Sequence, residues 1–75
     1  MKKLNEVNCQ TTVKVTKLLA TGLLRERLLA LGVTPGALIE VIKKGPKNNL
    51  TVYSIRGAMI ALRVEESRLI LVEEI

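Results

Sequence analysis

Residues 37–63 read ALIEVIKKGPKNNLTVYSIRGAMIALR, three short runs rich in aliphatic and β-branched residues. This spacing predicts strands over 37–44, 50–56 and 58–63. A Gly-Pro pair marks the first turn, and a lone glycine marks a bulge or corner between the second and third strands. The stretch therefore indicates a β-rich fold built from short strands.

Further strand signals flank this stretch on both sides. Residues 11–18 alternate valine with lysine and threonine, and residues 68–73 form an aliphatic run after a tight connection over 64–67. A sheet this small could not otherwise protect its edges, so closure into a barrel is favoured. We predict a mainly β fold, a small SH3-like five-stranded barrel, as a single domain over residues 1–75.

One short helix is expected after the first strand. Thr21 is the predicted N-cap of a helix over 22–31. Leucines at the i, i+4 and i+7 positions, starting with Leu24, make one apolar stripe on it. Gly32 suits the left-handed residue that follows a helix. The helix is thus an insertion between the first two strands of the barrel.

Periodicity divides the apolar residues into an inner and an outer set. The predicted core consists of Leu24, Leu28, Leu31, Val33, Ile39, Val41, Val52, Ile60, Leu62, Ile70 and Val72. Leu29, Leu69 and Leu71 are expected to face outward, and Leu23 and Met59 are candidates to join them. Isolated exposed leucines are ordinary, whereas a contiguous set would mark a docking patch. Both interpretations stay open at this point.

The composition argues against catalysis and against a bound metal. The chain contains no His and no Asp, so neither a Ser-His-Asp nor a Cys-His arrangement can form. Cys9 is the one cysteine and cannot hold a metal alone. We predict no enzyme activity, no cofactor and no metal site. An unpaired cysteine without a signal peptide or a transmembrane run fits the reducing cytosol.

The formal charge of +5 permits attraction to nucleic acid, anionic lipid or an acidic protein. Lys43, Lys44 and Lys47 cluster around one turn. However, proteins that bind single strands stack bases on aromatic side chains, and Tyr53 is the one aromatic residue here. A nucleic-acid-binding barrel is therefore the less favoured alternative.

Residues 22–36, GLLRERLLALGVTPG, resemble the signature of the ferrous-iron transport protein A family (FeoA). The matching pieces are Arg27-Leu28, Leu31-Gly32 and Pro35-Gly36, and similar pieces continue in order through the last strand. The loop at Asn48-Asn49 departs from the family, which commonly has Gly-Asp-Pro there. A partner contact made by that loop would differ from the usual one.

The resemblance implies an SH3-like barrel in the bacterial cytosol. Its implied partner is the GTPase domain of ferrous-iron transport protein B (FeoB), a membrane transporter, so the membrane is reached only through the transporter. The C-terminal domain of metal-dependent repressors of the diphtheria-toxin-repressor type has the same fold. A stand-alone relative of that domain is the homologous alternative. Self-association, and whether the transporter is activated, inhibited or merely stabilised, stay open.

Nine residues are candidates for contact with the partner. They are Leu23, Arg25, Arg27, Leu29, Arg56, Met59, Arg63, Leu69 and Leu71. Arg27, Arg56 and Arg63 are the arginines of the family motif. Each could bridge to backbone carbonyls or glutamates at the rim of the barrel, or present an exposed basic contact.

Overall fold

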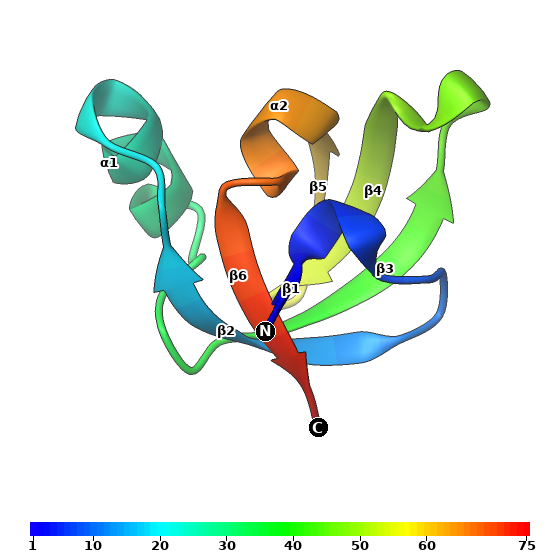
Figure 1. Cartoon of the computed structure of the whole chain (residues 1–75), viewed down its shortest axis with the longest axis horizontal. Helices are drawn as coiled ribbons and strands as arrows, with labels where there is room; N and C mark the ends of the chain where they lie inside the picture. The colour runs from blue at the N-terminus through cyan, green and yellow to red at the C-terminus, as the bar shows by residue number, and fades with distance from the viewer.

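The computed structural model describes residues 1–75 apart from the side chain of Asn48. Six antiparallel strands form one curled sheet in the order β1-β6-β2-β3-β4-β5 (Figure 1). The strands are β1 (Lys2–Lys3), β2 (Thr12–Leu18), β3 (Leu38–Lys44), β4 (Leu50–Ile55), β5 (Ala58–Arg63) and β6 (Ile70–Glu74). The helices are the α-helices α1 (Gly22–Ala30) and α2 (Val64–Ser67) and the 3₁₀ turns η1 (Leu4–Glu6) and η2 (Pro46–Asn48). None of them, over the residues described, has the length and hydropathy needed to cross a membrane.

The mainly β fold is confirmed, but the closed five-stranded barrel is wrong. The helix follows the strand from which it was predicted to emerge, but that strand is the second, because the short strand β1 precedes it. The sheet has six strands and stays open, because β1 and β5 stand at its two edges and do not pair. Strand β1 is only two residues long and pairs with β6, so it is too short to close the sheet against the six residues of β5. The tight connection predicted over 64–67 is the single helical turn α2.

Most of the core lies between the curled strands. The buried apolar residues are Leu4, Val7, Val13, Val15, Leu18, Ala20, Leu28, Val33, Ala37, Ile39, Val41, Tyr53, Ile55, Leu62, Ile70 and Val72. The inward positions of β3 agree with the sequence pattern, but β4 is out of phase with it. Val52 is only half-buried, whereas Tyr53 pairs with Val41 and is 1% exposed. A register shift between Val41 and Lys43 accompanies this arrangement.

Tyr53 forms a polar contact inside the core. Burial raises the pKa of the Tyr53 phenol above its usual 10.0, and side-chain hydrogen bonds with Ser67 and Thr51 oppose this rise. Thr51 and Ser67 are themselves buried. Because its ring is enclosed, Tyr53 offers no platform on which a nucleic-acid base could stack.

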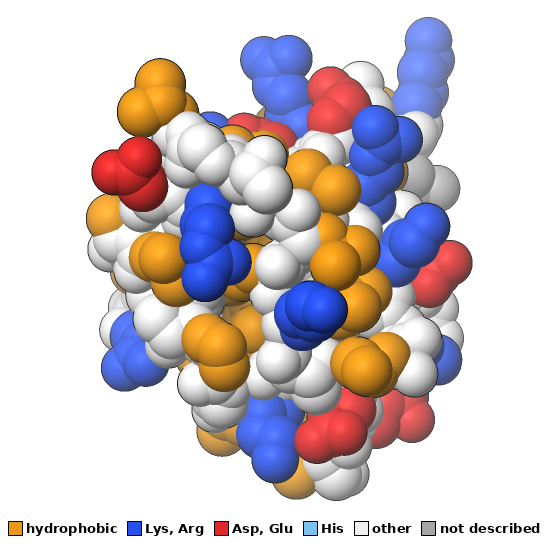
Figure 2. Space-filling view, turned by 60° about the vertical axis from the view of Figure 1, so that its left-hand side comes forward, with side chains coloured by type: hydrophobic (Ala, Val, Ile, Leu, Met, Phe, Trp, Pro, Cys, Tyr) orange, Lys and Arg blue, Asp and Glu red, His pale blue; other side chains and the backbone are white. Residues whose placement is uncertain are grey.

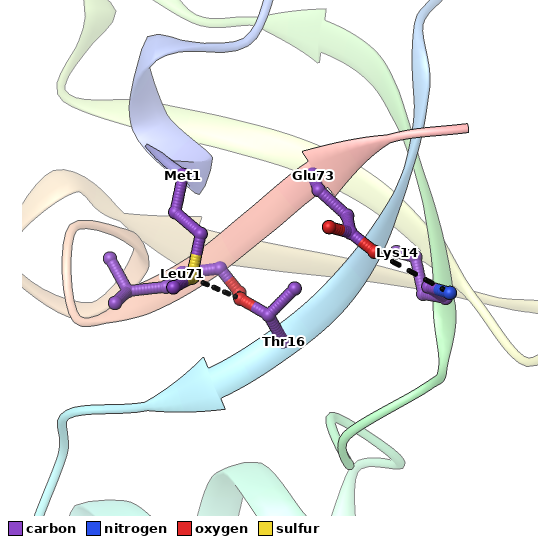
Figure 3. Close-up of polar contacts among 5 residues, drawn as sticks. All are labelled: Met1, Lys14, Thr16, Leu71 and Glu73. Carbon is purple, nitrogen blue, oxygen red and sulfur yellow. Dashed lines mark hydrogen bonds and ion pairs between the residues drawn. The ribbon is translucent and has the colours of Figure 1, made fainter.

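The N-terminal segment completes the core at the β6 side. Leu4 and Val7 are buried although they lie outside any strand or helix pattern in the sequence. Figure 3 shows how the adjoining residues meet: Thr16 Oγ1 donates to the Leu71 carbonyl oxygen and lies 3.0 Å from Met1 Sδ. Thr16 is also the extra residue where the register of β2 against β6 shifts. This bulge turns its hydroxyl toward the first residues of the chain.

Candidate partner-binding surface

Helix α1 carries most of the family-like signature, and its two ends are fixed by different means. Thr21 is extended and precedes the helix as predicted, but its side chain makes no capping hydrogen bond. At the other end the Gly32 N–H donates to the Leu29 carbonyl and the Val33 N–H to the Leu28 carbonyl. This pair of bonds is a Schellman motif, with Gly32 at the left-handed position. The sequence prediction for Gly32 is therefore confirmed.

The Arg56 side chain lies directly against Gly32. Arg56 Nε donates to the Gly32 carbonyl oxygen over 3.2 Å, and Nη2 donates to Thr34 Oγ1 over 2.9 Å. A β-carbon at Gly32 would stand 2.6 Å from Arg56 Cδ. Glycine is thus favoured here by its φ of +97°, and a β-carbon would in addition displace the Arg56 side chain from its present position. The contact ties the β4–β5 turn to the segment after α1.

Glu66 ties α1 to α2. The Glu66 carboxylate forms an ion pair with Arg27, and its Oε2 accepts a hydrogen bond from Arg27 Nη1. Its other oxygen, Oε1, accepts a hydrogen bond from the Arg63 backbone N–H at 2.9 Å. The Arg63 backbone bond and the Arg27 guanidinium lower the pKa of the Glu66 carboxyl, against a smaller opposing effect of burial. The positions of α1, α2 and the end of β5 are therefore linked through one charged side chain.

We call the region formed by α1, α2 and Arg56 the α1–α2 surface. Figure 2 brings the α1 side of the molecule forward and shows hydrophobic side chains lying among Lys and Arg side chains. Leu23, in the first turn of α1, is 84% exposed, and Arg25 beside it is exposed as well. Leu19, just before the helix, is 43% exposed and was not singled out by the sequence pattern. These side chains make a mixed apolar and basic surface.

Not all the apolar candidates face outward. Leu29 and Leu69 are half-buried and pack against the core, so the expectation that they point to solvent is wrong. On α1 the buried face is wider than the predicted stripe, because Leu29 packs against the core in addition to Leu24 and the fully buried Leu28 of that stripe. The Leu69 carbonyl oxygen also accepts a hydrogen bond from the Leu19 N–H at 2.7 Å.

The remaining candidates are spread over other strands. Leu71 is half-buried in β6 and pairs with Lys3 of β1 and Lys17 of β2. Met59 is 68% exposed on β5, opposite Ser54 of β4. The structure therefore does not gather the five apolar candidates on one element.

The motif arginines divide between the two roles left open by the sequence. Arg27 and Arg56 bridge to a glutamate and to a backbone carbonyl, which is the structural role. The side chain of Arg63, the third motif arginine, makes no hydrogen bond or ion pair within the described part of the molecule, and the same holds for Arg25, which lies outside the motif; both residues are exposed. Arg63 also lines a pocket of about 300 Å³ together with Asn49, Leu50 and Glu65.

No group of three or more metal-ligating side chains occurs among the residues whose placement is described. Cys9 is exposed and unpaired. The interactions described above are hydrogen bonds and ion pairs between α1, α2 and the β4–β5 turn, and they fix the shape of the surface. The chemistry available on the α1–α2 surface is accordingly that of contact: apolar burial, ion pairing and hydrogen bonding.

Comparison with known proteins gives consistent matches. The model of the FeoA domain family matches residues 2–74. The solution structure of iron(II) transport protein A from Clostridium thermocellum aligns with a TM-score of 0.93 and 32% identity, over 97% of this chain and 45% of that one. This chain thus spans less than half the length of that protein. The FeoA-like protein from Clostridium acetobutylicum aligns with a TM-score of 0.88 and 30% identity, over 97% and 85% of the two chains.

More distant structures share the fold alone. Stenotrophomonas maltophilia FeoA complexed with zinc, described as a prokaryotic SH3 domain protein, aligns with a TM-score of 0.86 and 23% identity, over 97% of this chain and 91% of its own. A manganese-dependent transcriptional repressor aligns with a TM-score of 0.89 and 15% identity, over 99% of this chain and 41% of its own. The comparison with curated proteins gives no match. The SH3-like character expected from the sequence is thus supported by a structural neighbour.

Proposed function

As this chain belongs to the FeoA family, we propose that it is a non-catalytic accessory protein of bacterial ferrous-iron uptake. In this proposal it binds the GTPase domain of the membrane transporter FeoB in the cytosol and modulates the activity of that domain. Support comes from the family match and from the iron-transport role named for the C. thermocellum relative. The repressor-like neighbours support the fold and carry no argument for DNA binding by this chain.

One observation carries the proposal. Leu23 is 84% exposed on the helix that bears the family signature, while the other leucines of that helix are buried or half-buried. A large apolar side chain exposed at the start of a well-anchored helix is suited to insertion into a pocket of a partner. Arg25 lies two residues further on and is free to pair with a carboxylate at the rim of such a contact.

The side-chain contacts that hold the elements of the α1–α2 surface together favour recognition of a folded partner. Arg27 and Glu66 hold α1 against α2, and Arg56 holds the segment after α1 against the β4–β5 turn. A surface held in this way loses little conformational entropy when a partner docks on it. Arg27 and Arg56 therefore act in this proposal as positioning residues, and Leu23 and Arg25 as contact residues.

The direct test is a calorimetric titration of this protein with the GTPase domain of FeoB from the same organism, with GTP hydrolysis followed in parallel. The proposal predicts saturable binding and a changed hydrolysis rate at saturation. Leu23→Glu should weaken binding at least tenfold, because it removes a buried apolar contact and places a charge in the interface.

A matched control is Leu38→Glu on β3. Leu38 is 53% exposed and belongs to a strand outside the α1–α2 surface, so this change adds the same charge elsewhere. It should leave the affinity within about twofold of the original value. Absence of binding by the unaltered protein would remove the proposed function. Equal weakening by both variants would remove the assignment to Leu23.

A further inference from the structure

The positive charge of the chain is concentrated in one segment. Residues 41–64 contain five Lys or Arg residues and no Glu, whereas the rest of the chain contains seven of each sign. The formal charge of +5 therefore equals the charge of this segment alone. The five residues are Lys43, Lys44, Lys47, Arg56 and Arg63.

Four of these residues lie toward the same end of the sheet. Lys43 and Lys44 end β3, Lys47 is in η2, and Arg63 pairs with Leu50 at the start of β4. Arg56 is at the opposite end of β4, where it is engaged with Gly32. We call Lys43, Lys44, Lys47, Leu50 and Arg63 the β3–β4 turn surface.

The charges of this surface are not neutralised within the molecule. No ion pair is formed by any of its four basic side chains in the part of the chain that the structure describes, whereas Lys2, Lys14 and Arg27 each pair with a glutamate elsewhere. Two carboxylates lie close to Arg63: Glu65 lines the same pocket, and Glu66 accepts the Arg63 backbone N–H at 2.9 Å but is ion-paired with Arg27. A net positive field therefore remains at this end of the molecule.

Apolar side chains lie among these charges. Leu50 is 42% exposed, and Pro46 in the turn is also exposed. Leu50 and Arg63, which pair across β4 and β5, both line the open pocket of about 300 Å³. The methylene chains of flexible lysines can lie beside such exposed apolar groups in an interface, while the lysine ammonium groups stay in water.

We propose that the β3–β4 turn surface binds the headgroups of an anionic lipid bilayer. A lysine ammonium is a compact point charge that needs no fixed geometry, and three of the four basic residues here are lysines. Such charges fit a diffuse planar anionic surface better than a site for bidentate pairing. Exposed Leu50 and Pro46 favour lipid over duplex nucleic acid, because a hydrated phosphate backbone offers them no apolar environment.

This inference departs from the sequence prediction that the membrane is reached only through a transporter. It is independent of the proposed function, because it invokes no contact with a GTPase domain and uses residues outside the α1–α2 surface. Each basic residue near an anionic leaflet raises partitioning roughly fivefold. Four of them together give a weak and reversible association that falls steeply as salt rises.

The test is sedimentation of the intact chain with vesicles of phosphatidylglycerol and phosphatidylcholine in equal parts, and with vesicles of phosphatidylcholine alone. The chain should bind the anionic vesicles and not the neutral ones, with binding lost at high salt. The double change Lys43→Glu with Lys47→Glu should lower the partition coefficient at least tenfold. Leu50→Ser should lower it severalfold without altering the formal charge.

The control is Lys3→Glu with Lys17→Glu, which changes the formal charge by the same amount at exposed positions of β1 and β2. It should retain most of the binding, and unfolding curves should show that both double variants stay folded. Equal losses in the two double variants would mean attraction by net charge alone and overturn the proposal. Absence of vesicle binding by the unaltered chain, or tighter binding to duplex DNA at the same salt, would also overturn it.

Discussion

Replacement of Gly32 by alanine tests how the end of α1 is built. The residue has a φ of +97°, and an added β-carbon would stand 2.6 Å from Arg56 Cδ. The left-handed conformation costs an L-residue about 1–2 kcal/mol. The Arg56 side chain is flexible, so it would move aside rather than clash. Its hydrogen bonds to the Gly32 carbonyl and to Thr34 would then be lost.

The two contributions add to a sizeable loss of stability. Arg56 is exposed, so its two hydrogen bonds are worth about 1 kcal/mol together rather than the larger value of buried charged bonds. We expect Gly32→Ala to lower the free energy of unfolding by about 2–3 kcal/mol. For a domain of this size the corresponding fall in the melting temperature is about 10 °C or more.

Gly36 provides the control for the backbone contribution. It has a φ of +89°, but nothing lies within 4 Å of the β-carbon it would carry. Urea unfolding should therefore show that Gly36→Ala costs only the conformational part, about 1–2 kcal/mol. In an Arg56→Ala background, Gly32→Ala should cost no more than Gly36→Ala. An undiminished cost without Arg56, or equal costs of the two glycine changes in the unaltered protein, would refute this reasoning.

Two further predictions concern the buried and the linked polar groups. Tyr53→Phe should cost about 1–2 kcal/mol in urea unfolding, because the buried hydroxyls of Thr51 and Ser67 lose a partner; a neutral change would contradict the hydrogen bonds assigned to the phenol. Glu66 has a lowered pKa in the folded state, so its stabilising contribution is present above the unfolded value of 4.5 and is lost as pH falls through the folded pKa. Melting temperatures from pH 7 down to about pH 3 should therefore fall less steeply for Glu66→Gln than for the unaltered chain, and identical slopes would count against the linkage.

The sequence predicts the strands well where burial alternates along them. In β3, Ile39 and Val41 turn inward and Leu38 and Glu40 turn outward, as the period of two requires. The end of α1 was predictable for a different reason, since only Gly32 suits the left-handed position after the helix. Local chemistry was sufficient in both cases.

Elsewhere the tertiary structure decides, and the sequence pattern fails. In β4 two neighbouring residues, Val52 and Tyr53, could each point into the core. The alternation of apolar and polar residues alone cannot tell which of them does. The pairing of Tyr53 with Val41 accompanies its inward position, where Thr51 and Ser67 are buried as well. Leu4 is likewise buried by a short 3₁₀ turn that carries no periodic signal.

The candidate surface could be predicted only in part. The exposure of Leu23 follows from its place off the apolar stripe of α1, and the structure agrees. The roles of Arg27 and Arg56 could not be read from the sequence, because their partners Glu66 and Gly32 lie 39 and 24 residues away. Only the folded chain shows which arginines are engaged and which are free.

The most direct test of the central claim is to locate the bound partner on this molecule. Amide resonances of the isotope-labelled chain would be followed while the GTPase domain of FeoB is added. We predict that the largest changes fall on α1 and α2, around Leu23 and Arg25, and that the outer face of β3 is unaffected. Changes confined to β3 and β4, or no changes at saturating partner, would contradict the account.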